Sequence, residues 1–272
     1  MVDPGLSFEV IVVMIEKVRH YEKSDIGLLR QNNEDSFLVV DQDCGGYDLQ
    51  RYGMIFVIAD GMGGHAAGEI ASRMACEEAV SGYYGDDVLF QDHTDAGEWN
   101  ARKLEKTFWS AHKKLIDFAS TKEELRGMGT TLSALALADG RALIAHVGDS
   151  RIYRCRNSSC ERMTIDHTKN QALIDTGQIR PEQEENHYYG RIITQALGGY
   201  DDLTAVFTRA EDVHSGDVFL LCTDGLHDLV ADHEIKEILI ENNSPQAACD
   251  ELVQAAIRRG GHDNVTVIVV KV

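Results

Sequence analysis

Apolar positions along the chain fall into two repeating patterns, and the first of them predicts strands. Short, almost continuous apolar runs favour buried strands; they lie at 36–40, 54–59, 130–138, 142–147, 151–155, 217–222 and 264–272. In the third run, Leu132, Ala134 and Ala136 point to one face. Leu135 and Leu137 point to the other, so this strand is apolar on both faces. Antiparallel sheets usually keep one face in water, so such strands predict a second sheet on one side and helices on the other.

The segment 130–155 predicts local strand pairing. Three of the apolar runs follow one another here with very short connections, and Asp139-Gly140 between the first two is a favourable two-residue hairpin turn. We therefore expect a meander of three antiparallel strands in this segment.

The second pattern predicts helices. Apolar residues recur at spacings of three and four in 66–80 and 103–119. At 244–260, Ser244 can cap the helix, Pro245 suits its first turn and Gly260 can close it. Together these elements predict an α+β fold: a four-layer αββα sandwich, with two antiparallel β-sheets packed face to face and flanked by helices.

The amino-acid composition is typical of a globular protein. Of the 272 residues, 43% are hydrophobic and 26% are charged, and only three are proline. The sequence contains no Gly/Ser-rich or Pro-rich linker, so we expect a single domain over residues 1–272.

Net charge bears on the possible partners, and the cysteines bear on zinc binding and on the redox compartment. The formal net charge is −19, whereas a nucleic-acid phosphate backbone requires a basic face. An acidic excess is typical of a solvated surface, and it is also compatible with a carboxylate-rich cation site. The six cysteines form no CxxC pair, so zinc is unsupported and we expect reduced cysteines in a cytoplasmic protein.

Three aspartates lie where predicted strands begin or end. Asp60 and Asp224 each follow an apolar run and precede glycine, and Asp263 comes shortly before the last strand. A single Asp-Gly pair is more typical of a turn than of a ligand. If these edges meet at one end of the sandwich, however, the carboxylates converge and must be protonated or bind a cation. Magnesium or manganese prefers such oxygen ligands, and Gly61 allows a backbone carbonyl to approach the ion.

The stretch "SDIGLLRQNNEDSF" (24–37) is a second source of chemistry. The guanidinium of Arg30 is suited to binding a phosphate, and Glu34 and Asp35 could orient metal-bound water. Taken alone, the stretch is a polar loop that enters a strand. The polar segment 166–196 also has two interpretations: it fits either a lid or a short surface helix with loops.

Six segments together resemble the motifs of the metal-dependent Ser/Thr protein phosphatases, the PPM or type 2C family. In order, they are "SDIGLLRQNNED", "IADGMGGHAAGEIAS", "GMGTTLSAL", "AHVGDSRIY", "LLCTDGLHD" and "GGHDNVTV". They span about residues 20–272 and are most similar to the small bacterial stand-alone members. The resemblance implies the four-layer fold and makes 166–196 the flap beside the active site. Residues 1–15 have no counterpart and are expected to be an N-terminal extension, either an added strand or a stretch before an alternative start at Met14.

By position, the resemblance implies a two-metal centre containing Mn²⁺ or Mg²⁺. Asp60 would bridge the two ions, and the Gly61 carbonyl would bind one of them. Asp224 and Asp263 would complete the protein ligands of the other ion. Such a pair of ions lowers the pKa of a shared water, which then attacks phosphorus in line without a phosphoenzyme.

The resemblance also implies roles around that centre. Arg30 would hold the substrate phosphate, and Glu34 and Asp35 would act mainly through metal-bound waters. Asp149 matches a residue that holds a third, weaker ion together with Asp224; the alternative is an aspartate in a hairpin turn.

The general acid is the point at which the sequence departs from many eukaryotic members. They have a histidine directly after the first Asp-Gly, whereas this chain has Met62, as bacterial relatives do. His65 lies three residues further on and could simply help to form the loop, and metal-bound water is the other candidate acid. His227 and His262 adjoin metal-site aspartates, and we interpret both as packing or hydrogen-bonding residues.

Other phosphate-binding families fit less well. Asp41-x-Asp43 after a strand is a feature of haloacid-dehalogenase phosphatases, but Cys44 follows where the motif continues differently. "GMGG" lacks the Lys-Ser/Thr of a P-loop. A catalytically silent phosphoprotein-binding module on the same fold is the second hypothesis, and the presence of Arg30 with all the metal-site aspartates disfavours it.

We therefore expect an active phosphatase for phosphoserine and phosphothreonine in proteins. Its expected partners include a cognate Ser/Thr kinase or the substrates of that kinase. We expect a cytoplasmic monomer without nucleic-acid or membrane partners.

Overall fold

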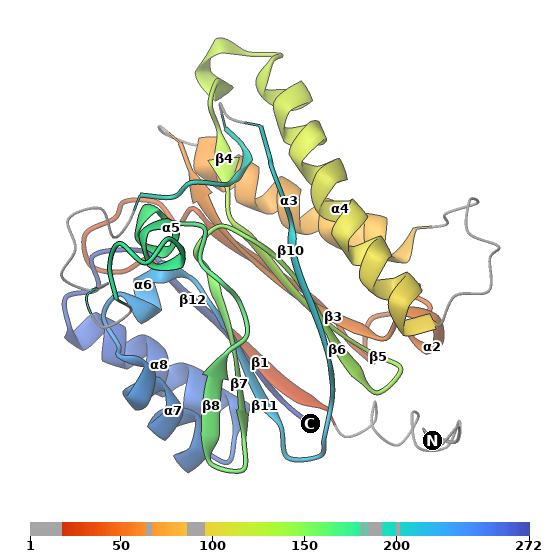
Figure 1. The fold of residues 1–272 in the computed structure, drawn as a ribbon, viewed down its shortest axis with the longest axis vertical. Coiled ribbons are helices and arrows are strands. Elements are labelled where there is room, and N and C mark those ends of the chain that lie inside the picture. The colour runs from red at the N-terminus through yellow and green to blue at the C-terminus, as the bar shows by residue number, and fades with distance from the viewer. Residues whose placement is uncertain (1–17, 64–66, 86–95, 181–182, 184–191, 200–201) are drawn as a thin grey trace.

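The fold is a sandwich of two antiparallel sheets covered by helices on both outer faces (Figure 1). The computed structural model describes residues 18–63, 67–85, 96–180, 183, 192–199 and 202–272. The expected four-layer αββα architecture is confirmed. The segment 1–15, His65 and parts of 166–196 lie outside the described residues.

Each sheet joins strands from distant parts of the sequence. The larger sheet has the order β10 (Phe207–Asp212), β6 (Arg141–Val147), β5 (Leu132–Ala138), β3 (Met54–Met62), β4 (Gly129–Thr130) and β9 (Leu197–Gly198), with β2 (Asp35–Val40) also paired to β3. The smaller sheet has the order β1 (Arg19–Asp25), β12 (Val265–Lys271), β11 (Val218–Cys222), β7 (Arg151–Arg156) and β8 (Ser159–Arg162).

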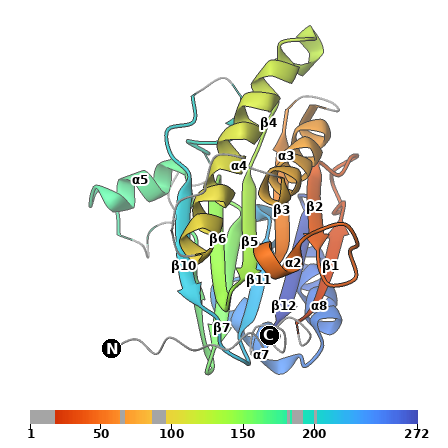
Figure 2. The same cartoon turned by 90° about the vertical axis from the view of Figure 1, so that its right-hand side faces the viewer.

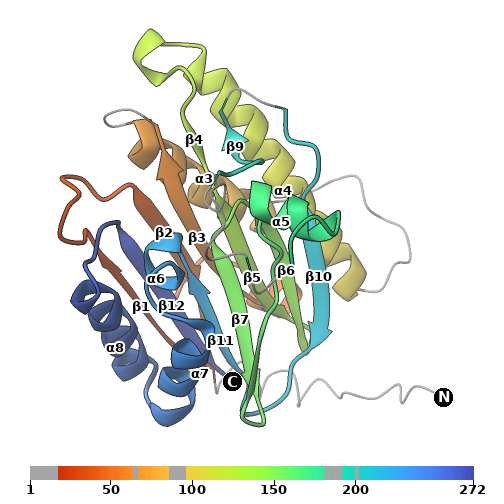
Figure 3. The same ribbon diagram turned by 60° about the vertical axis from the view of Figure 1, so that its left-hand side comes forward.

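Helices are segregated between the two outer faces, as the side views show (Figures 2 and 3). The larger sheet is covered by α3 (Ala67–Tyr84) and α4 (Ala96–Ala119), with α2 (Leu49–Tyr52) nearby. The smaller sheet is covered by α7 (Asp232–Glu241) and α8 (Pro245–Arg258), and α6 (Asp224–His227) follows β11. A short helix α5 (Lys169–Asp175) and a 3-10 turn (Glu123–Leu125) complete the described helices.

Alternation along the strands creates three apolar layers. Ile55 and Val57 of β3 lie in the core beneath α3 and α4, whereas Phe56 and Ile58 lie in the core between the sheets. β5 alternates in the predicted way, since its even-numbered residues from 132 to 136 join the first core and its leucines at 135 and 137 join the second. A third core lies between the smaller sheet and α7 and α8. Burial on both faces therefore explains the apolar runs.

The structure corrects the predicted three-stranded meander. β5 and β6 form the expected hairpin, in which Asp139 (φ 52°) and Gly140 (φ 71°) make the turn. β7, however, pairs with β11 and β8 in the other sheet. The chain crosses between the sheets at Gly148, whose φ of 111° favours glycine. Asp149 consequently lies at a crossing between sheets, and the alternative of a hairpin turn does not apply.

Four strands were not predicted, and each lies at the edge of a sheet: β1, β8, β9 and β10. β1 has the sequence RHYEKSD and, among the described strands, pairs with β12 alone; β10 alternates exposed and half-buried residues. β8 and β9 are short outer strands. Such strands are short or carry many polar residues, and they lack the continuous apolar run that identified the central strands.

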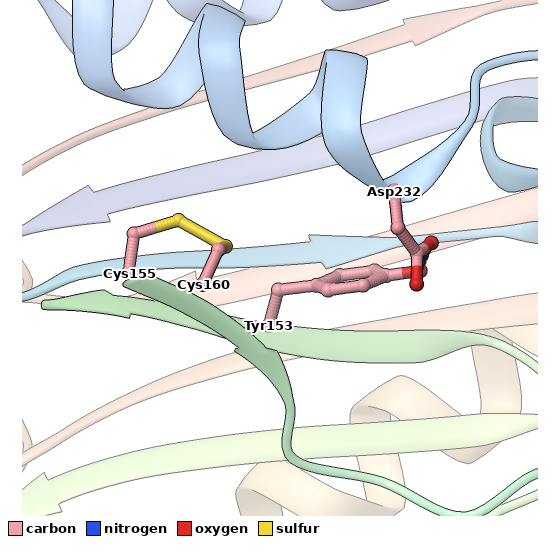
Figure 4. Close-up of a disulfide and its surroundings, with 4 residues drawn as sticks. All are labelled: Tyr153, Cys155, Cys160 and Asp232. Carbon is pink, nitrogen blue, oxygen red and sulfur yellow. Dashed lines mark hydrogen bonds between the residues drawn. A yellow bond between two sulfur atoms is a disulfide. The ribbon is translucent and has the colours of Figure 1, made fainter. Parts of the chain in front are cut away.

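The expectation of reduced cysteines is wrong for one pair in this structure. Cys155 and Cys160 form a disulfide between directly opposed positions of β7 and β8 (Figure 4). Register brings them together: Asn157 and Ser158 form a two-residue turn, both with positive φ. Spacing in the sequence alone could not reveal this pairing. Cys44, Cys76, Cys222 and Cys249 are free thiols.

In the part of the chain that the structure describes, no helix combines the length and apolar character needed to cross a membrane.

Candidate active site

Acidic side chains from both sheets gather at one end of the sandwich. Asp35 begins β2 and lies directly opposite Asp60 on β3. Asp224 begins α6 at the end of β11, and Asp263 precedes β12, which runs antiparallel to β11. Asp149 lies at the crossing from β6 to β7. These strands end or begin at the same end of the sandwich, so Asp60, Asp224 and Asp263 converge as their positions predicted. Asp35 and Asp149 join them there.

Burial and repulsion by neighbouring carboxylates raise the pKa values of Asp60 and Asp149. Burial raises the pKa of Asp60 well above its usual range, and Asp224 and Asp35 raise it further. Burial likewise raises the pKa of Asp149, with Asp224 as the strongest neighbouring charge. These carboxyl groups must share protons or bind cations to remain together in a buried place.

Asp35 is buried but is held by two hydroxyl groups. Thr223 Oγ1 and Thr266 Oγ1 donate hydrogen bonds to Asp35 Oδ2 over 2.9 and 2.6 Å. Burial raises the pKa of Asp35 to about 7, although the two hydroxyl donors oppose the rise. The sequence gives little sign of either role: Thr223 is a polar residue next to Asp224, and Thr266 is a polar residue inside the apolar run of β12.

Asn264 holds the loop between β1 and β2 against the segment that carries Asp263. Its side-chain amide donates to the carbonyls of Ile26 and Asn32 over 2.9 and 3.0 Å. Its side-chain oxygen accepts a hydrogen bond from the Glu34 amide over 2.8 Å. Asn264 was also overlooked, because its role depends on contacts more than 200 residues away in the sequence.

Arg30 lies at the solvent-facing side of the acidic cluster. Its Nη2 donates to Asp263 Oδ2 over 2.5 Å, and its side chain is about half exposed. This hydrogen bond raises the pKa of Arg30, and the charges of Glu34 and Asp60 act in the same direction. An exposed guanidinium beside buried carboxylates is positioned to meet an incoming anion.

Glu34 is partly buried next to the start of α3. Desolvation raises its pKa, while Arg30 lowers it. The Gly61 amide donates to the Glu34 carbonyl over 3.1 Å. A Cβ on Gly61 would lie 2.2 Å from the Gly68 carbonyl oxygen, so only glycine permits this close approach of three backbone segments.

His227 has the packing role expected from the sequence. It is buried, and its Nε2 is 3.0 Å from the carbonyl oxygen of Asp149. Burial lowers the pKa of His227 to about 3, so the side chain is neutral near pH 7. His227 therefore fixes the position of the segment that carries Asp149.

The residues present are compatible with divalent cations. No three acidic, histidine or cysteine side chains of the described residues already form a compact metal-binding group. Ions of this type can take several ligands from water and only a few from protein. Oδ1 of Asp35 and Oδ1 of Asp149 are buried without a hydrogen-bond partner in the described part of the chain. Buried acceptor oxygens without donors are suited to bind a cation or its waters.

The segment predicted to be the flap begins beside the cluster. The His167 amide donates to the Gly148 carbonyl over 2.7 Å, and Arg151 binds Asp166 through an ion pair of 2.6 Å. α5 follows, and Thr168 caps its N-terminus. The start of 166–196 is therefore tied to the crossing that carries Asp149. The parts of this segment at 181–182 and 184–191 lie outside the described residues.

Comparison with known proteins identifies the family. The family model described as protein phosphatase 2C matches residues 31–257. The serine/threonine protein phosphatase PstP of Mycobacterium tuberculosis is 35% identical over 255 residues, which cover 94% of this chain and 45% of PstP. The chain thus spans less than half the length of that relative.

Two further matches cover nearly their full length. The protein phosphatase PhpP of Streptococcus pneumoniae is 37% identical over 248 residues, which cover 91% of this chain and 94% of PhpP. A crystal structure of the PstP catalytic domain in complex with two manganese ions has a TM-score of 0.76 and 33% identity. That match covers 93% of this chain and 97% of the other. The chain belongs to the protein phosphatase 2C family.

Proposed function

We propose that this protein is a metal-dependent serine/threonine protein phosphatase, with residues 1–272 forming a single phosphatase domain. The observation that carries the proposal is the convergence of five carboxylates from both sheets beside one exposed arginine. This arrangement offers oxygen ligands for cations next to a guanidinium for a phosphate. Membership of the protein phosphatase 2C family and the similarity to a phosphatase with two manganese ions support it.

Part of the acidic cluster would bind the metal ions. Asp60 and the Gly61 carbonyl, with Asp224 and Asp263, would hold two divalent ions, either Mn²⁺ or Mg²⁺. When bound, such ions supply water activation and neutralise negative charge.

The neighbouring residues would act on phosphate and water. Arg30 would bind oxygens of the substrate phosphate, which requires its guanidinium to turn from Asp263 toward the ligand. Glu34 and Asp35 would accept hydrogen bonds from water at the site and orient it. Asp149, which has a buried oxygen without a donor among the described residues, would hold a third ion together with Asp224.

The substrates would be proteins that carry phosphoserine or phosphothreonine. A Ser/Thr kinase or its targets would supply them, since a phosphatase of this class consumes the product of such a kinase. We propose a cytoplasmic monomer, in which the Cys155–Cys160 disulfide would be exposed to reduction by cytosolic thiols.

The test is hydrolysis of p-nitrophenyl phosphate and of a phosphothreonine peptide, with Mn²⁺ or Mg²⁺ and with excess EDTA. We expect turnover of both substrates with metal and none with EDTA. Asp224→Asn should lower kcat/KM by at least about 10²-fold, because it removes a charge that binds the ion.

Asp139→Asn is the matched control. Asp139 also precedes glycine, but it lies in the β5–β6 hairpin turn, where asparagine is equally favourable. Near-normal turnover by Asp224→Asn would overturn the assignment of the site. No turnover by a folded, metal-loaded protein would instead favour a silent phosphoprotein-binding module.

A further inference from the structure

Two of the most exposed apolar side chains in the described structure lie directly beside the arginine of the proposed phosphate site. Leu28 is 62% exposed and Leu29 is 72% exposed, more than any other large hydrophobic residue that the structure describes. Both precede Arg30 in the loop between β1 and β2. Exposed apolar surface that the fold does not require often marks a binding surface. We call Leu28 and Leu29 the apolar shelf.

The shelf stands on a fixed backbone. The Leu28 amide donates to the Gly261 carbonyl over 2.6 Å, and the Gly27 amide donates to Asp25 Oδ1 over 2.8 Å. Gly27 has a φ of +79°, and a Cβ there would lie 2.3 Å from the carbonyl oxygen of Asp263. The loop thus lies in backbone contact with the segment that carries Asp263, and it presents the shelf at a defined place.

Both chain segments that support the shelf also carry the proposed chemistry. Arg30 follows Leu29 directly, and its guanidinium binds the carboxylate of Asp263. Successive Cα atoms are about 3.8 Å apart. When Arg30 binds the phosphate, a substrate residue one or two positions from the phosphorylated residue can therefore reach Leu28 or Leu29. The shelf is therefore continuous with the place where the phosphate would bind.

From this geometry we infer that the apolar shelf binds an aliphatic or aromatic side chain one or two residues away from the phosphorylated residue of the substrate. The inference rests on the proposed phosphatase function and adds a substrate preference to it. An acidic residue at that position is disfavoured because contact with the leucines would remove its carboxylate from water without a polar partner. Binding of an apolar side chain removes exposed leucine surface from water.

The test compares phosphothreonine peptides that differ only at the residues next to phosphothreonine. One carries leucine there, a second asparagine and a third aspartate. We expect the wild-type protein to hydrolyse the leucine peptide with a kcat/KM about tenfold higher than that for the asparagine peptide, an effect typical of one apolar contact. The aspartate peptide should be the poorest substrate.

The double variant Leu28→Gln, Leu29→Gln should reduce the leucine-to-asparagine ratio to about one, mainly by raising KM for the leucine peptide. The ratio is measured within one preparation, so it does not depend on the active fraction or on metal loading. If the double variant folds poorly, the leucine-to-asparagine ratio is measured for Leu29→Gln alone, for which we expect a smaller decrease. Ile240→Gln is the control, because Ile240 is 42% exposed on α7 and should leave the ratio unchanged.

The outcomes separate this inference from the proposed function. If the wild-type protein hydrolyses p-nitrophenyl phosphate but does not distinguish the peptides, only the shelf is overturned. A preference that survives both substitutions overturns it as well. If the variant changes the sedimentation coefficient but not the ratio, the shelf is a contact between two copies and the inference is wrong. If no substrate is hydrolysed, the proposed function itself fails.

Discussion

Asp35 illustrates at the scale of a single residue how the fold stabilises a carboxylate within an acidic cluster. It is buried opposite Asp60, and burial and neighbouring charge both favour its protonated form. Thr223 and Thr266 each donate a hydrogen bond to the same carboxylate oxygen and favour its charged form. The two hydroxyl groups thus keep one oxygen occupied and leave the other available.

Thr266→Val tests this positioning. Valine has nearly the same shape, but it removes the donor that lies 2.6 Å from Asp35. Residues that orient metal-site groups typically change metal affinity by about 10-fold or more. We expect the Mn²⁺ dissociation constant to rise about tenfold, as measured by isothermal titration calorimetry.

Thr107→Val is the control for the loss of a buried threonine hydroxyl. Thr107 is buried in α4, far along the chain from the acidic residues, and its hydroxyl donates to the Leu104 carbonyl. An unchanged Mn²⁺ affinity in Thr266→Val would show that Asp35 does not depend on this donor. A decrease in both variants would point to general destabilisation.

The β7–β8 hairpin shows at the scale of an element how one covalent bond supports the surroundings of the site. The Cys155–Cys160 disulfide joins the two strands near the turn (Figure 4). On the same strand, the Tyr153 hydroxyl donates to Asp232 Oδ1 at the start of α7 over 2.9 Å. Arg151 at the other end of β7 binds Asp166. The hairpin therefore connects α7 with the segment that leads to the flap.

Replacing both cysteines by serine should lower the free energy of unfolding. A disulfide that closes a loop of this length reduces the conformational entropy of the unfolded chain. In the chain-entropy account this stabilises the folded state by about 2 kcal/mol. We expect a loss of about that size in urea unfolding under oxidising conditions. A reducing agent should lower the stability of the wild-type protein to that of the variant.

Cys44→Ser provides the comparison, since Cys44 is a half-buried free thiol outside the hairpin. It should respond to the reducing agent as the wild-type protein does. Equal stability of the wild-type protein with and without reducing agent would contradict the predicted contribution of the disulfide.

How much of the fold the sequence predicts depends on where each element lies. Central strands such as β5 and β12 are buried on both faces, so continuous apolar runs identify them. The helix at 244–260 was recognisable because Ser244 caps it, accepting a hydrogen bond from the Ala247 amide. Edge strands such as β1 carry polar residues and give no such signal.

Pairing between elements is harder to predict than the elements themselves. The sequence indicates β7, but not that Gly148 directs the chain into the other sheet. The same limit applies to the site. The acidic residues follow from their place at strand ends, whereas the contacts of Asn264 with Ile26 and Asn32 depend on distant register.

At the scale of the whole molecule, folding concentrates negative charge. The chain has a net charge of −19, and the two sheets bring five carboxylates to one end. Self-repulsion of this kind destabilises a compact state. Cations at the proposed site would reverse the effect, because they would bind only where the carboxylates are assembled. The free energy of folding and the proposed metal site are therefore coupled.

This coupling predicts how the metal-free protein responds to pH. The pKa of Asp35 is raised to about 7 on folding, from about 4 in an unfolded chain. The folded state then holds the proton more tightly, so this stabilisation is present below about pH 4 and lost as the pH rises through about 7. In EDTA, Asp35→Asn should therefore raise Tm relative to the wild-type protein at pH 8 more than at pH 4. Excess Mn²⁺ should stabilise the wild-type protein at pH 8 by about 2.7 kcal/mol at 100 times its dissociation constant. Scanning calorimetry measures both effects, with Asp139→Asn as the control; a Tm difference that does not vary with pH would refute the coupling.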